Sequence, residues 1–272
     1  MNKGMSSYTF IFNALKYDYP IEESVESILP AVDQHVLCVC FSTDGTKELC
    51  DKLAKKHSKI KLIHMPWGNH FSVQEALANY CMHVADFEWT FKLDADEVLH
   101  HDSVSKLKEI PNVVGEDIGA VSTHYTHFMA NYETEFDFCY RRVTRMSRKA
   151  AGWYWTGDAC DLNPGKGKVF DSDIEIFHYG KVKNEKIAFQ KEWDFQQMYT
   201  DLGFPDPKMK EMKDKLGEEI CDYLYLFENA ITSGKVRKFT GTHPLVMLDR
   251  IQKFKRDGFE QFVSKMKEGL KL

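Results

Sequence analysis

The first hundred residues switch repeatedly between two spacings of apolar side chains. Short apolar runs predict β-strands at 8–14, 35–41, 60–65 and 88–93. Apolar residues three or four positions apart predict helices at 21–29, 46–57 and 71–85, the first of them bounded by Pro20 and Pro30. Because strand and helix alternate, we expect an α/β fold with a mainly parallel, right-handed sheet flanked by helices.

The second half of the chain has a different pattern. Alternating apolar positions predict β structure at 118–129, 136–148, 153–161 and 174–179. From Lys183 onward the pattern is helical, and one apolar stripe there predicts core packing, at Leu216, Ile220, Leu224, Phe227 and Ile231. We therefore expect a core at 1–182 and a helical C-terminal extension at 183–272, packed as one compact unit.

Composition narrows the class of protein. With 272 residues, 43% of them hydrophobic, the chain can bury a core, and its net charge of −5 argues against a wholly basic nucleic-acid binder. No run approaches the roughly 18 apolar residues of a membrane span, and the first residues lack an apolar signal core, so we expect a cytoplasmic protein. The cysteines form no CxxC pair, which indicates free thiols in a reducing compartment. They are Cys38, Cys40, Cys50, Cys81, Cys139, Cys160 and Cys221.

The most informative polar cluster follows the strand at 88–93. Asp94, Asp96 and Glu97 stand within four residues, and strand alternation would bring the side chains of Asp94 and Asp96 to one point. Neighbouring carboxylates need a cation, and oxygen ligands suit Mg²⁺ or Mn²⁺. The polar turn at 42–46 follows another strand of the same expected sheet. Ligands of such sheets bind beyond the carboxyl ends of the strands, so both signals indicate one site for a phosphate-bearing ligand.

These features together resemble a known family. The turn Ser42-Thr-Asp-Gly-Thr46, then Asn79, then Trp89 through Asp94-Ala-Asp-Glu97 are similar in order and spacing to family 2 glycosyltransferases of the GT-A fold. The resemblance covers residues 8–100 and extends more loosely to 182. It implies a Rossmann-like GT-A core and the metal-dependent, inverting transfer of a sugar from a nucleotide diphosphate to an acceptor hydroxyl. A UDP-sugar is the favoured donor, and GDP- and dTDP-sugars stay open on the sequence.

The resemblance also implies roles for individual residues. Asp96 would be the main ligand of Mn²⁺ or Mg²⁺, and Asp94 would contact the ribose, the metal or both. His178, in a His-Tyr-Gly segment similar to one in many family members, would complete the metal site. The remaining donor contacts would come from the end of the first strand and from the 42–46 turn, at Phe12, Asn13, Ala14 and Asp44.

A further landmark concerns the acceptor. Family members often carry a Trp-x-Gly followed by a His-Glu pair whose carboxylate lies near the acceptor. Aligned on Trp155 and Gly157, this pair falls on Cys160 and Asp161. Inverting transfer needs a carboxylate that takes the acceptor proton, so Asp161 is the first candidate base and Asp158 the second.

Cations for the diphosphate are harder to place. Arg142 or Arg145, which precede this landmark, would contact the diphosphate. Family members often carry Arg-Asn in the helix before the acidic cluster, where this chain has Ala78-Asn79. Asn79 would still contact the donor, but the cation of that pair is missing.

Two other functions stay open on the sequence. Nucleotidyl transfer also uses strand-end aspartates and a divalent metal, although its glycine-rich loop after the first strand is missing from Asn13–Tyr17. The other is a non-catalytic nucleotide- or sugar-binding relic of the fold. The acceptor is open among a glycan, a lipid-linked sugar, a protein side chain and a hydroxylated nucleobase, and so is the oligomeric state. Two histidine pairs, His100-His101 and His124-x-x-His127, lack the partners of a closed zinc site, so we interpret them as surface or strand-edge histidines.

Overall fold

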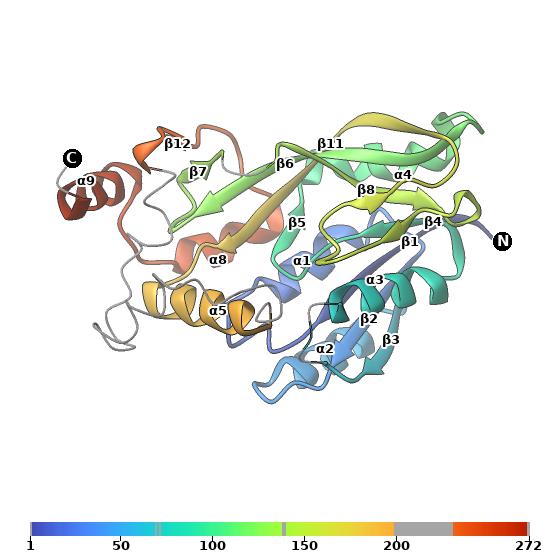
Figure 1. Ribbon diagram of the computed structural model, residues 1–272, viewed down its shortest axis with the longest axis horizontal. Helices are drawn as coiled ribbons and strands as arrows, with labels where there is room; N and C mark the ends of the chain where they lie inside the picture. The colour runs from blue at the N-terminus through green and yellow to red at the C-terminus, as the bar shows by residue number, and fades with distance from the viewer. Residues whose placement is uncertain (1, 69, 71, 138–139, 199–230, 271–272) are drawn as a thin grey trace.

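The computed structural model describes residues 2–68, 70, 72–137, 140–198 and 231–270 (Figure 1). Its N-terminal part alternates strands and helices, in the order β1 (Asn2–Ile11), α1 (Ile21–Ile28), β2 (Gln34–Cys40), α2 (Thr46–Lys56), β3 (Ile60–Met65), α3 (Val73–Val84) and β4 (Phe87–Lys92). These elements agree with the sequence periodicity to within a few residues. The exception is β1, which begins at Asn2 rather than Tyr8.

The first four strands form the parallel part of the sheet. β1 lies between β2 and β4, β3 flanks β2, and all three pairings are parallel. The expectation of a parallel α/β sheet is therefore confirmed for this part of the chain. Parallel strands have their carboxyl ends at one edge, so the segments that follow β1, β2 and β4 lie close together.

Helices cover both faces of this parallel part. In β2, Val36, Cys38 and Cys40 pack with residues of α3, whereas Leu37 and Val39 pack with residues of α1 and α2. Both sides of β2 are therefore buried, which is why its sequence is apolar without alternation.

The next strands extend the same sheet in a mixed arrangement. β8 (Arg142–Arg148) pairs antiparallel with β4 and with β6 (Ile118–Met129). β11 (Lys168–Lys181) is parallel to β6 and antiparallel to β5 (Glu97–Leu99), and Figure 1 shows β6 and β11 side by side across the top of the molecule. Among the residues described, the strands form one ten-stranded sheet and a separate ribbon of β9 (Tyr154–Trp155) with β10 (Leu162–Asn163).

Several segments differ from the sequence-based expectation, and of the β structure expected at 153–161 only Tyr154–Trp155 is a strand. The strand expected at 136–148 is divided, because β7 (Thr134–Phe136) pairs with β6 and β12 (Val236–Lys238) while β8 pairs with β4. A helix that the pattern did not indicate, α4 (Val104–Val113), follows the short 3₁₀-helix η1 (His101–Ser103). Pro111 lies inside α4 and weakens its helical signal. A second 3₁₀-helix, η2 (Lys149–Ala151), follows β8.

The C-terminal extension packs on the core. Its described elements are α5 (Glu185–Met198), β12, the 3₁₀-helix η4 (Leu245–Met247), α8 (Leu248–Lys253) and α9 (Phe259–Leu270). The expectation of a wholly helical extension is wrong at β12, which pairs with β7. Residues of α5 and α9 pack with Met129 and Phe136. In the predicted apolar stripe Ile231 is buried, and its other four members lie outside the described residues.

Two compositional expectations also bear on the fold. Of the seven cysteines, five fall within the described residues and are free, and Cys160 is the one of these that is not fully buried. Cys139 and Cys221 lie outside the described residues. None of the helices described here combines the length and the apolar character needed to cross a bilayer.

Candidate active site

A pocket of about 490 Å³ opens at the sheet edge where β1 and β4 end. Its walls come from the segment after β1, the turn after β4, the loop after β9 and α5. The volume lies in the range of small-ligand sites. The pocket also lies where α/β sheets bind their ligands, beyond the carboxyl ends of the parallel strands.

The segment after β1 is held in place by the 42–46 turn. Asn13 adopts a left-handed backbone with φ 44°, its Oδ1 accepts from the Thr43 N–H at 2.9 Å, and its N–H donates to Ser42 Oγ at 3.0 Å. Asp44 Oδ2 accepts from the Lys16 N–H at 2.7 Å. Asp44 therefore supports the pocket wall without lining it, which differs from the expected direct contact with a nucleoside.

Phe12, Asn13 and Ala14 line the pocket directly. The Phe12 ring stacks on Trp67, with centroids 4.5 Å apart and planes 4° apart. The stack gives this wall a flat apolar surface. Trp67 lies in the loop after β3 and was not expected at the site. An aromatic residue just beyond a strand end was the only sequence signal for a role there.

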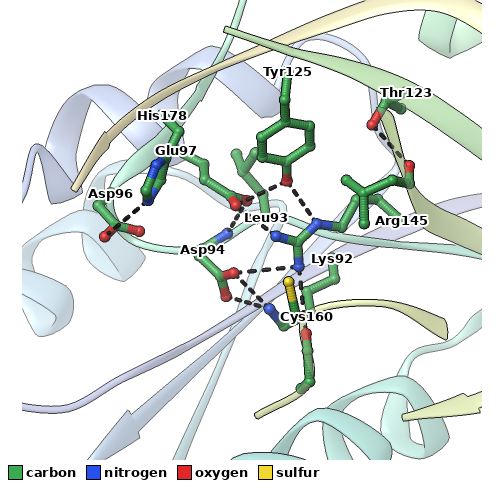
Figure 2. Close-up of polar contacts among 12 residues, drawn as sticks. Lys92, Leu93, Asp94, Asp96, Glu97, Thr123, Tyr125, Arg145, Cys160 and His178 are labelled. Atoms are coloured by element: carbon green, nitrogen blue, oxygen red, sulfur yellow. Dashed lines mark hydrogen bonds and ion pairs between the residues drawn. The ribbon is translucent and has the colours of Figure 1, made fainter. Parts of the chain in front are cut away.

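The acidic cluster does not converge on one point. β4 ends at Lys92, and the Glu97 N–H donates to the Asp94 carbonyl at 3.0 Å, so the cluster forms a turn. Alternate side chains share a direction only in an extended chain. Figure 2 shows Asp94 facing Lys92, at 2.5 Å, while Asp96 faces His178 on another side. The expected convergence of Asp94 and Asp96 is therefore wrong.

Glu97 is the buried centre of this turn. Its side chain is 2% exposed and accepts from the Arg145 guanidinium at 2.7 Å, the Tyr125 hydroxyl at 2.8 Å and the Asp94 N–H at 2.8 Å. Arg145 also lies 3.3 Å from the Asp94 carboxylate and donates to the Tyr125 hydroxyl at 2.6 Å. One buried carboxylate thus fixes the turn that presents Asp94 and Asp96 to the pocket.

Glu97→Ala is expected to lower the free energy of unfolding by about 3–5 kcal/mol, because it removes the nearest carboxylate from the buried Arg145 charge. Glu88 offers a matched control, since its carboxylate pairs with Arg148 at 2.6 Å in a more exposed setting. Glu88→Ala is expected to cost less than about 1 kcal/mol. Urea titration measures both values. Equal losses in the two variants would contradict the role assigned to Glu97.

Asp96 is the second carboxylate of the pocket wall. Its side chain is 11% exposed, and Oδ2 lies 3.5 Å from His178 Nε2 and 3.5 Å from Lys191 Nζ. Burial alone would raise the pKa of Asp96, but His178 and Lys191 together hold that pKa well below its usual range. Asp96 is therefore an ionised carboxylate at the pocket.

Gly180 keeps the space between Asp96 and His178 open. A Cβ atom on Gly180 would lie 2.4 Å from Asp96 Oδ2 and 2.6 Å from His178 Nε2. Divalent ions bind carboxylate oxygens and imidazole nitrogens at about 2.0–2.2 Å. One carboxylate and one neutral imidazole suit Mn²⁺ or Mg²⁺ and leave positions for phosphate oxygens. The residues present therefore fit a divalent cation.

The two candidate bases are placed differently. Asp158 lines the pocket, and its Oδ1 accepts from the Cys160 N–H at 3.1 Å. Asp161 does not line it, because its Oδ1 accepts from the N–H groups of Thr144, at 3.0 Å, and Leu162, at 2.9 Å. These bonds tie the β9–β10 ribbon to β8. The lining of the pocket therefore favours Asp158 over Asp161, and the role of either as base stays a prediction.

Arg142 and Asn79 also lie away from the pocket. Arg142 Nη1 donates to Ser122 Oγ at 2.9 Å and to the Ser172 carbonyl at 2.8 Å, which places it over β6 and β11. The Asn79 amide exchanges two hydrogen bonds, each of 2.9 Å, with the Trp155 backbone. Both side chains hold elements together and neither lines the pocket, so their contacts with a donor stay predictions.

Cations in the pocket wall include Arg145, Lys16 and Lys191. Lys191 belongs to α5, and on the same helix Asp194 accepts from Lys16 Nζ at 2.5 Å and from the Tyr17 hydroxyl at 2.8 Å. α5 therefore closes one side of the pocket, which the sequence analysis missed. No local signal marks these residues, because their partners lie far away along the chain.

His100 directly follows β5 and is buried, so the structure agrees with the strand-edge interpretation and not with the surface one. It is 5% exposed, its Nε2 lies 3.1 Å from the Thr242 carbonyl, and its Nδ1 accepts from the Asp102 N–H at 3.3 Å. His100, His101 and Asp102 form the one cluster of three potential ligands within 4.8 Å that is found in the part of the chain described. Since both ring nitrogens of His100 are engaged, its evident role is to cap η1.

The mixed sheet, the helices on both faces of its parallel part and the acidic turn beside a strand-end pocket define the GT-A fold class. Residues 13–152 match the family model described as glycosyl transferase family 2. The match spans more than half of the chain, so the protein belongs to this family and is a glycosyltransferase. Family membership therefore favours glycosyl transfer over nucleotidyl transfer.

Several solved structures are similar in arrangement. Residues 1–349 of TarS from S. aureus match with 14% identity and a TM-score of 0.44, over 86% of this chain and 74% of that chain. The mannosyltransferase PcManGT from Pyrobaculum calidifontis, in complex with GDP-Man and Mn²⁺, matches with 14% identity and a TM-score of 0.48, over 86% and 76%. Glucosyl-3-phosphoglycerate synthase from Mycobacterium tuberculosis, in complex with Mn²⁺, UDP and glucosyl-3-phosphoglycerate, matches with 14% identity and a TM-score of 0.43, over 75% and 82%. A comparison with curated proteins gives no match.

Proposed function

We propose that this glycosyltransferase is metal-dependent and inverting, and that its donor is a nucleotide diphosphate sugar, with a UDP-sugar as first candidate. The observation that carries the proposal is the Asp96–His178 pair with the space kept open by Gly180. An ionised carboxylate and an imidazole that face one small space in a pocket are suitable ligands for a divalent cation, which supports the proposal. Arg145 and Lys191 in the same wall suit the phosphates of a donor.

The donor is expected to bind along the wall after β1. In this proposal the base packs against the Phe12–Trp67 stack, and the backbone of Asn13 and Ala14 lines its edge. Asp94, which is paired with Lys92, contacts the ribose instead of ligating the metal. The diphosphate lies toward the cations of the opposite wall.

The chemical step is a single displacement at the anomeric carbon. The acceptor hydroxyl oxygen attacks this carbon on the side opposite the phosphate, and the carbon–oxygen bond to the diphosphate breaks with its electron pair on the diphosphate. Asp158 takes the hydroxyl proton. A divalent ion bound at Asp96 and His178 would neutralise the negative charge that develops on the leaving diphosphate. The acceptor is a hydroxyl of a glycan, a lipid-linked sugar, a protein or a hydroxylated nucleobase.

A thermal-shift screen of nucleotides and nucleotide sugars, with and without Mn²⁺, tests this proposal. A ligand at about 100 times its Kd stabilises the folded state by about 2.7 kcal/mol, which raises Tm by several degrees for a chain of this size. We expect such a rise with one nucleoside diphosphate and its sugar, and only when Mn²⁺ is present. The anomeric configuration of the product, read by NMR, then tests inversion.

Two other outcomes of the screen would contradict the proposal. A shift with nucleoside triphosphates alone would indicate nucleotidyl transfer. No shift with any nucleotide would favour a relic of the fold that has lost donor binding.

A further inference from the structure

The His178 ring is hydrogen-bonded on the side away from Asp96. His178 Nδ1 lies 3.0 Å from His127 Nδ1, and the two rings meet edge to face with centroids 5.0 Å apart. On its other side, His127 Nε2 lies 3.0 Å from the Tyr140 carbonyl oxygen. A continuous chain of hydrogen bonds therefore runs from the Tyr140 backbone through two imidazoles to the pocket.

The chemistry of each group assigns the donors and acceptors in this chain. A carbonyl oxygen only accepts, so His127 Nε2 carries a proton. His127 is buried, at 9% exposure, where a charged ring is costly and the neutral ring with one proton is favoured. His127 Nδ1 therefore has a lone pair and accepts from the Nδ1–H of His178. His178 Nε2, which faces Asp96 Oδ2 at 3.5 Å, is then the ring nitrogen left to bind a divalent ion.

We propose that His127 is a positioning residue that fixes the Nδ1–H tautomer and the ring orientation of His178, so that Nε2 is presented as a metal ligand. The inference rests on the proposed function, because it requires His178 to bind the divalent ion. A hydrogen bond to the second nitrogen of a ligating histidine fixes its tautomer and raises its basicity. Removal of such a bond costs about 10- to 100-fold in metal affinity.

Two substitutions of His127 can separate the effect of its hydrogen bond to His178 from the effect of its packing. Its ring contacts those of Tyr125 and Tyr140, with centroids 5.5 and 5.1 Å away. His127→Phe keeps an aromatic ring in this slot and removes the acceptor for His178. His127→Asn gives up the ring but keeps an oxygen acceptor close to the position of Nδ1. If His127 acts only by packing, His127→Asn should weaken Mn²⁺ binding more than His127→Phe does. If His127 positions His178, His127→Phe should weaken Mn²⁺ binding more.

The first measurement is Mn²⁺ affinity in the presence of UDP, by isothermal titration calorimetry or by electron paramagnetic resonance of the free ion. We expect His127→Phe to weaken binding about 10- to 100-fold, and His127→Asn to lie closer to wild type. His178→Ala serves as the reference for complete loss of the imidazole ligand. If His178→Ala weakens binding while His127→Phe equals wild type, the inference is overturned and the proposed function stands. If wild type itself binds no Mn²⁺, both are overturned.

The second measurement needs neither metal nor mutation of His127. Long-range ¹H–¹⁵N NMR spectra of the wild-type protein, with ¹⁵N-labelled histidine, report which ring nitrogen carries the proton. The His178 signals are assigned by their loss in His178→Ala. We expect Nδ1–H on His178 and Nε2–H on His127. A His178 Nδ1 that carries no proton would overturn the inference, even if the His127 variants failed to fold.

Discussion

Gly180→Ala is expected to remove metal-stimulated turnover while leaving the fold intact. The added methyl group would occupy the space between Asp96 and His178, 2.4 Å from Oδ2 and 2.6 Å from Nε2. Gly180 does not have a positive φ, so its backbone allows alanine, and the methyl group displaces only the side chains of Asp96 and His178. A divalent ion supplies several kcal/mol of charge stabilisation in the transition state, so we expect kcat/KM at saturating Mn²⁺ to fall by about 100-fold or more.

Initial rates across a Mn²⁺ titration measure this loss, and Gly68→Ala is the matched control. A Cβ on Gly68 would meet Val73 at 3.6 Å, an ordinary van der Waals contact, so its metal response is expected to match that of wild type. Asp96→Asn keeps the size of the side chain and removes its charge, and it should reproduce the loss. A Gly180→Ala enzyme with the wild-type Mn²⁺ response would show that the ion does not bind between Asp96 and His178.

The parts of the fold that the sequence predicted are those set by local pattern. β2 is apolar on both faces and α2 and α3 have apolar stripes, so periodicity alone places these elements and indicates that the strands are parallel. The 42–46 turn was recognisable for the same reason, since its polar residues follow directly after a buried strand. Its bonds to Asn13 and Lys16 show why such a turn shapes the site even where its side chains do not line the pocket.

The parts that the sequence did not predict depend on long-range partners. Asp94 and Asp96 diverge because β4 ends at Lys92 and because Glu97 is anchored by Arg145, which is far away along the chain. Lys191 reaches the pocket only through the packing of α5 on the core. Neither apolar periodicity nor motif spacing predicts such contacts. The pocket wall formed by α5 could therefore not be predicted from the sequence.

Asp158→Asn is expected to lower kcat by about 10²- to 10⁴-fold with little change in donor affinity, because a general base acts on proton removal alone. Asp161→Asn is the matched control. Its amide oxygen can still accept from the Thr144 and Leu162 N–H groups, so kcat is expected to stay near that of wild type. Turnover rates, together with donor affinity from calorimetry, separate the two. A large loss of kcat in Asp161→Asn alone would restore the order expected from the sequence.

A second acceptor distinguishes loss of a base from general damage at the site. A hydroxyl of lower pKa needs less help to lose its proton, so such an acceptor should recover part of the lost rate in Asp158→Asn. The same acceptor should recover little in Gly180→Ala, because there the missing stabilisation is on the leaving diphosphate. Equal recovery in both variants would mean that Asp158 does not take the proton. It would then act by shaping the loop through its bond to the Cys160 N–H, which is 3.1 Å long.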